Sequence, residues 1–185
     1  FENWRNLASP AQIEEMIGLL RSGRFELGAA HSTLHSGKAG VEEVNRLLWN
    51  AQRLRDQFNV PIDTMLFNDV PGVAWSYPQV LAKSGIKYLV CGMNLFIGGG
   101  FTQPYASYPF YWQGPDGSKI LVWATQHAYV EGWATWEPSK ISYGIPFGTN
   151  QNATINKSYL EAALKELTDK GYPYDAVLVM HSADA

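Results

Sequence analysis

The sequence predicts an α/β protein with a mainly parallel sheet, and two observations carry this prediction. Short apolar segments alternate with amphipathic segments whose apolar residues recur at helical spacing, from about residue 10 to residue 92. Near the C-terminus, another helical pattern is followed by a nearly all-apolar segment. Alternation of this β-α-β-α-β kind is typical of parallel strands joined by crossover helices.

Four segments are expected to form helices, because apolar residues repeat in each of them at a helical period. The second is the most strongly amphipathic, since Val44, Leu48 and Ala51 lie on one stripe with Arg and Glu opposite. Gly23 follows the first segment and Gly85 ends the third, and both are typical helix stop signals. The predicted helices are 10–22, 41–58, 77–85 and 157–171.

Four short apolar runs are expected to form strands, at 25–30, 62–68, 86–91 and 175–181. The stretch between about 93 and 150 is less regular. Within it, PFYWQG and SKILVWAT flank the turn residues PDGS, which predicts a β-hairpin.

Composition excludes several classes of protein. Hydrophobic residues make up 46% and charged residues 17%, which excludes a disordered chain. The net charge is −3 and the basic residues are scattered, so nucleic acid is not an expected partner. No apolar run reaches the roughly 18 residues that a membrane helix needs. Cys91, the single cysteine, lies in an apolar run and is interpreted as a small buried residue.

The whole chain is interpreted as one domain, residues 1–185, that is incomplete at both ends. It has no initiator Met, and it stops at VLVMHSADA, where a predicted strand has just run into a loop. A strand at that place normally leads into a further helix. Neither the oligomeric state nor the compartment follows from the sequence, although a secreted or periplasmic location is compatible with it.

Aromatic residues are the one compositional excess. They make up 14% of the chain, and many of its seven Trp and ten Tyr lie in stretches that also carry Gly and Pro. Aromatic faces stack on the C–H faces of sugar rings, so such loops suit a carbohydrate-binding cleft. The alternative is that these side chains only pack beneath long loops.

Polar residues follow the predicted strands at the end where parallel α/β folds place their sites. If the strands run in one direction, these residues converge on one cleft. Each also has a simpler interpretation as a turn former, a helix cap or a surface loop residue. The residues are His31 and His35, Asn68 and Asp69, Asn94, and His181 and Asp184.

Two kinds of chemistry suit this set of side chains. Glycoside hydrolysis uses two carboxyl groups, one ionised to attack the anomeric carbon and one protonated to serve as an acid. Carboxylate and imidazole are also the usual zinc ligands outside thiolate sites. The spacing does not choose between them, and the chain has no HExxH, CxxC or GxSxG motif.

Three stretches resemble the catalytic domain of family 38 α-mannosidases. FNDVPGVAWSYPQVLAKSGIKYLV is similar to the family segment in which an Asp at a strand end begins an Asp-Pro-Phe-Gly-His type motif. The closing VLVMHSADA is similar to a Leu-Gly-Asp-Asp-Phe type strand end, and RSGRFELGAA to a helix that leads into a Gly-Arg-Leu-Glu-like strand. The resemblance runs in order over most of the chain.

This resemblance implies an irregular seven-stranded β/α barrel and a retaining α-mannosidase that binds one zinc ion. It implies that Asp69 is both the nucleophile and a metal ligand, and that Asp184 is the acid/base. Tyr129 roughly matches a cleft aromatic. The remaining residues expected to contact a mannoside or related glycan are His31, His35, Trp75, Asn94 and His181.

The sequence departs from the family pattern at several points. Val-Pro-Gly replaces Pro-Phe-Gly-His after Asp69, and His-Ser-Ala-Asp replaces Leu-Gly-Asp-Asp at the end. The family's His-x-His-Asn-Asp type metal strand would precede Phe1, and a further metal-binding His would follow Ala185. We therefore expect the other zinc ligands to lie outside this chain. Two alternatives stay open, a metal-dependent polysaccharide deacetylase and a catalytically silent carbohydrate-binding domain.

Overall fold

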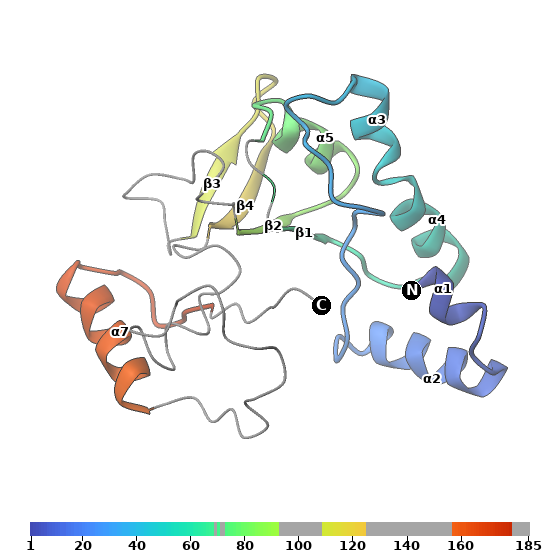
Figure 1. The fold of residues 1–185 in the computed structure, drawn as a ribbon, viewed down its shortest axis with the longest axis horizontal. Coiled ribbons are helices and arrows are strands. Elements are labelled where there is room, and N and C mark those ends of the chain that lie inside the picture. The colour runs from blue at the N-terminus through green and yellow to red at the C-terminus, as the bar shows by residue number, and fades with distance from the viewer. Residues whose placement is uncertain (69, 71–72, 93–108, 125–156, 179–185) are drawn as a thin grey trace, which may run out of the picture.

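The computed structural model describes residues 1–68, 70, 73–92, 109–124 and 157–178. Their centre is a four-stranded sheet with the strand order β1-β2-β4-β3, and helices lie around it (Figure 1). The strands are β1 (Thr64–Asn68), β2 (Tyr88–Gly92), β3 (Pro109–Gln113) and β4 (Lys119–Ala124).

The sheet is mainly parallel, as the sequence predicts. β1 pairs with β2 and β2 with β4 in parallel, whereas β3 is antiparallel to β4. The antiparallel pair is the predicted hairpin, and its turn is closed by the Gly114 N–H, which donates to the Ser118 carbonyl at 2.8 Å. Two of the predicted strands, 62–68 and 86–91, are confirmed within two residues as β1 and β2.

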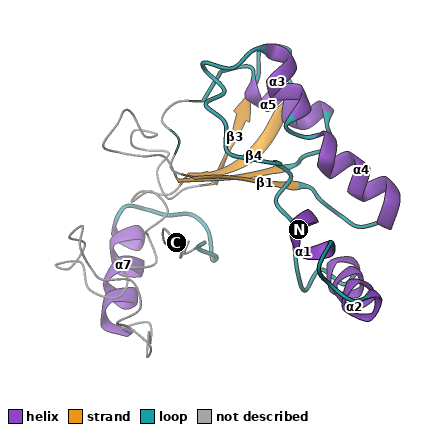
Figure 2. Ribbon diagram, turned by 45° about the vertical axis from the view of Figure 1, so that its right-hand side comes forward, coloured by secondary structure: helices purple, strands orange, loops and turns teal. Residues whose placement is uncertain are grey.

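Helix α5 (Tyr77–Lys83) is the crossover between β1 and β2. It ends as the sequence predicts, because Gly85 has φ +77° and the next N–H, that of Ile86, donates back to the Leu81 carbonyl at 2.9 Å. Figure 2 shows α5 and α3 (Val41–Arg46) on one side of the sheet. The Arg55 guanidinium reaches this connection from α4 (Trp49–Phe58) and donates to the Ser84 carbonyl at 2.8 Å.

The N-terminal helices are α1 (Glu2–Arg5) and α2 (Pro10–Arg21), and the second confirms the prediction for residues 10–22. Ser9 caps α2 in a capping box with Gln12. The guanidinium of Arg21 then donates to the Phe58 carbonyl at 2.7 Å, which attaches the end of α2 to the end of α4.

The single helix predicted at 41–58 is wrong, since α3 and α4 are separate helices. Its apolar stripe is nevertheless buried, with Val44 and Ala51 at 7% and 2% exposure. The break falls at Leu47 and Leu48, where the Leu47 carbonyl accepts the His31 N–H at 3.0 Å instead of continuing one helix. A contact with a distant segment therefore interrupts a helix that the local pattern would continue.

The strand predicted at 25–30 is also wrong, because this segment is not assigned to the sheet. It lies beside β1 and makes one backbone bond to it, from the Ala29 N–H to the Thr64 carbonyl at 2.9 Å. The next N–H that could continue pairing with β1 is that of His31, but it donates to the Leu47 carbonyl instead. Gly28 also disfavours a strand, because glycine weakens strand interiors.

Near the C-terminus, α7 (Lys157–Asp169) confirms the helix predicted at 157–171. The strand predicted at 175–181 is not seen in its first part, since residues 175–178 form no strand. Residues 179–181 lie outside the described residues. Among the described residues, no helix is long and apolar enough to cross a membrane.

One continuous core joins the helices to the sheet. Phe67 from β1 meets Tyr77 from α5 edge to face, with ring centroids 6.1 Å apart. Leu81 and Val122 are fully buried in the same core. Cys91 is buried there as well, as predicted, and burial raises the pKa of its thiol to about 12.

The other side of the sheet carries several exposed apolar side chains. Leu66, Tyr88 and Tyr111 are 48%, 43% and 71% exposed. Tyr88 and Tyr111 both flank Leu121, because β2 and β3 pair with β4 at that position. This exposed sheet face thus runs across all the strands.

We expect Leu81→Ala to lower the free energy of unfolding by about 2–5 kcal/mol, because it leaves a cavity beneath the sheet. The matched control is Leu7→Ala, since Leu7 is 89% exposed and its loss should change the free energy by at most about 0.5 kcal/mol. Chemical unfolding of the full-length protein measures both. Equal effects of the two substitutions would contradict this description of the core.

Candidate active site

The carboxyl ends of β1, β2 and β4 lie at one edge of the sheet. The register pairs Asn68 with Gly92, and Cys91 with Ala124, so the three strands end side by side. We call this the C-terminal edge. Parallel α/β folds bind their ligands at this edge, because the loops that leave it are free to carry functional residues.

Three of the predicted site residues follow this edge within five residues in the sequence. Asp69 is the residue after Asn68, Asn94 comes two residues after Gly92, and Tyr129 follows Ala124 by five residues. All three lie outside the described residues, as do His181 and Asp184. The structure therefore brings together the strands that lead into the predicted site, and the positions of these five side chains stay predictions.

On the side of the sheet that carries Leu66, two polar atoms near the C-terminal edge are buried. Asn68 lies on the same side of β1 as Leu66, and the Leu66–Val90–Trp123 register puts Trp123 on that side too. The Asn68 Oδ1 and the Trp123 Nε1 are both buried and have no hydrogen-bond partner among the described residues. An amide acceptor and an indole donor are both groups that bind hydroxyls.

Trp123 is absent from the residues expected from sequence to contact a ligand. The hairpin could have identified it from sequence. The turn at PDGS fixes the register of β3 and β4, so residues 119, 121 and 123 share one side of β4, and Trp123 is the residue of that set nearest the strand end. Asn68 was recognisable because it directly follows an apolar run.

His31 and His35 lie on an exposed loop that is fixed at two points. The His31 N–H is bonded to the Leu47 carbonyl, and the His35 carbonyl accepts the Lys38 N–H at 2.9 Å. Ser36 is buried and its hydroxyl accepts the Ala74 N–H at 3.0 Å. This bond attaches the histidine loop to the segment that follows Asp69 by five residues.

Trp75 lies away from the C-terminal edge. Its side chain is 68% exposed, and its Nε1–H donates to the Gln113 carbonyl at 3.3 Å. Gln113 pairs with Lys119, the first residue of β4, at the opposite edge of the sheet from Ala124. The structure thus does not bring Trp75 together with the strand ends that carry the other predicted residues.

No metal-binding cluster is present in the described part of the chain, where no three His, Cys, Asp or Glu side chains lie together. The predicted ligand Asp69 is outside that part, so the expectation of zinc is not tested by these residues.

Comparison with known proteins gives one extensive match. Residues 1–182 match the family described as "Glycosyl hydrolases family 38 N-terminal domain". The match includes Asp69 and ends two residues before Asp184. No curated protein matches the chain.

Among solved structures, the chain is similar to a 4-alpha-glucanotransferase from Thermococcus litoralis. The two share 15% sequence identity with a TM-score of 0.49, over 66% of this chain and 19% of that one. The chain therefore spans about a fifth of that enzyme's length, and a likeness this distant carries no functional argument.

We predict that His31, Asp69 and Asp184 open onto one cleft, because Asp69 follows β1 at the C-terminal edge and the Ser36–Ala74 bond attaches the histidine loop to the segment after it. The Asp69 and Asp184 carboxyl groups should be about 5–5.5 Å apart, the separation of a retaining glycosidase. An experimental structure of the full-length protein with a bound sugar analogue measures this distance. Placement of the two carboxyl groups at opposite edges of the sheet would contradict the site.

Proposed function

This chain belongs to glycosyl hydrolase family 38, as its N-terminal domain, and on that premise we propose that the protein is a retaining α-mannosidase-like glycosidase. Asp69 is the proposed nucleophile and Asp184 the proposed acid/base. The observation that carries the proposal is the family match over a segment in which Asp69 directly follows β1. The adjacent ends of β2 and β4 support it, since they supply the edge at which such a site forms.

In the proposed reaction, the Asp69 carboxylate attacks the anomeric carbon of the mannoside. The bond from that carbon to the glycosidic oxygen breaks, and Asp184 donates a proton to the leaving oxygen. Water then attacks the covalent glycosyl-enzyme, Asp184 accepts a proton from it, and the Asp69 carboxylate is released.

The two carboxyl groups need different surroundings. A nucleophile must be ionised at the working pH, whereas a general acid must hold its proton until the leaving oxygen needs it. The apolar VLV segment before His181 suits the second role, because an apolar environment favours the neutral form of a carboxyl group.

Zinc belongs to the proposal through the family resemblance, with Asp69 as one ligand. No step above depends on it. The other ligands are expected outside this chain, at positions before Phe1 and after Ala185.

The first prediction separates the roles of the two carboxyl groups. Asp69→Ala should abolish turnover of every glycoside, because no other group replaces the nucleophile. Asp184→Ala should retain turnover of dinitrophenyl glycosides, whose leaving group needs no proton, and should lose turnover of disaccharides. Steady-state kinetics of the full-length variants on both substrates measure this. Equal losses on both substrates in the Asp184 variant would refute its role as the acid, and full activity in the Asp69 variant would end the glycosidase proposal.

The second prediction concerns metal content. The full-length protein should contain about one zinc ion per chain, and residues 1–185 alone should retain little, because the expected ligands lie on both sides of this segment. Elemental analysis after extensive dialysis measures both. Stoichiometric zinc in the shorter protein would show that residues 1–185 complete a site by themselves.

A further inference from the structure

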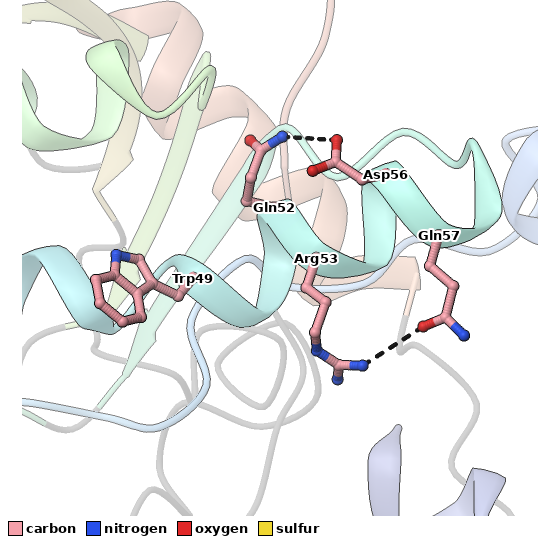
Figure 3. A pocket seen from close by; sticks show the side chains of 5 residues that line it. All are labelled: Trp49, Gln52, Arg53, Asp56 and Gln57. Carbon is pink, nitrogen blue, oxygen red and sulfur yellow. Dashed lines mark hydrogen bonds between the residues drawn. The ribbon is translucent and has the colours of Figure 1, made fainter.

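We propose that the outer face of α4 is a second carbohydrate-binding site, remote from the C-terminal edge. The site is a shallow, open hollow of about 750 Å³ lined by five residues of this one helix (Figure 3). They are Trp49, Gln52, Arg53, Asp56 and Gln57. The choice of a sugar as the ligand rests on the family, whereas the catalytic residues have no part in the inference.

Trp49 supplies a fixed aromatic surface at one end of the hollow. Its side chain is 58% exposed, and the Arg46 guanidinium lies 4.7 Å from the centroid of its ring. Arg46 is itself paired with Glu42 at 2.7 Å, so the ring is held from one side. Figure 3 shows Trp49 at one end of the row of lining side chains, where the C–H face of a sugar ring can stack on it.

Polar side chains along the rest of the hollow are ordered before any ligand binds. The Gln52 amide donates to Asp56 Oδ1 at 2.9 Å, and Arg55 donates to the Gln52 Oε1 at 3.2 Å. The Arg53 guanidinium donates to Gln57 at 3.4 Å, as Figure 3 shows. Groups that are already fixed lose little entropy on binding, so each contact with a ligand contributes more of its energy.

The remaining hydrogen-bonding groups match hydroxyls. Within the described residues, the Asp56 Oδ2 and the Gln57 Nε2 have no hydrogen-bond partner, which leaves one acceptor and one donor among the lining side chains. The charge of Arg53 is offset by its ion pair with Glu2. Equal numbers of positive and negative side chains line the hollow, so its chemistry favours a neutral polyhydroxyl ligand over an anion or a cation.

The spacing sets the size of the ligand. Trp49 and Asp56 are seven residues apart on one helix, a rise of about 10 Å, which is close to the length of two linked pyranose rings. One ring of an oligosaccharide would stack on Trp49, and the next would reach the Gln52–Asp56 pair. The site therefore fits an internal stretch of a polysaccharide better than a single sugar.

Retention of the full-length protein in non-denaturing gels that contain a soluble α-mannan tests the site. Trp49→Leu should weaken retention about five- to tenfold, because it keeps an apolar side chain but removes the stacking face. Trp49→Tyr keeps an aromatic face and should stay within about twofold of the natural protein. Leu7→Ala, a control that removes another exposed apolar side chain, should change nothing.

Kinetics on a small aryl mannoside separate this inference from the proposed function. All three variants should retain the natural kcat/KM, because the substrate is too short to reach α4. If the protein hydrolyses no mannoside, the retention of the variants in the gels still tests whether α4 binds the polysaccharide. Undiminished retention of Trp49→Leu would overturn the proposal. A change in oligomeric state in that variant, measured by light scattering, would overturn it too, since α4 would then be a protein interface.

Discussion

The parallel pairing of β2 with strands on both of its sides is the constraint on which the described structure depends. A parallel neighbour requires a crossover connection, and α5 supplies the one between β1 and β2. Gly85, in a left-handed conformation, ends this connection shortly before β2. It thereby determines where β2 begins, and so which residues of β2 pair with β1. The same register makes Asn68 and Gly92 end together, so the edge that would bear the active site results from backbone pairing.

Long-range bonds of single backbone groups give the N-terminal half its shape. The hydrogen bond from the His31 N–H to the Leu47 carbonyl separates α3 from α4 and takes the next backbone donor that could pair residues 25–30 with β1. The Ser36 hydroxyl attaches the same loop to Ala74. These bonds determine where the histidine loop lies relative to the segment after β1. They also fix the beginning of α4, and through it the direction in which Trp49 faces.

The sequence predicted the features that depend on local patterns. The helix ends at Gly23 and Gly85, the parallel strands β1 and β2, and the hairpin all follow from periodicity and turn chemistry, and the structure confirms them. The break at Leu47 could not be predicted, because the group that accepts the His31 N–H lies 16 residues away in the sequence. The placement of Trp75 likewise depends on a contact with Gln113 across the hairpin. For the candidate site, the strand ends at Asn68 and Gly92 were predicted correctly, whereas the strands expected to lead to His31 and His181 are not found among the described residues.

The exposed sheet face has a consequence for the handling of this protein. Water-facing strands normally alternate polar and apolar residues, and parallel sheets are usually covered on both faces. Here Leu66, Tyr88 and Tyr111 are exposed on one side of the sheet, an apolar surface of the kind that favours association. Any version of the protein in which this face stays uncovered would favour self-association through it. Truncations made to simplify crystallisation should therefore be chosen by what they leave on this face.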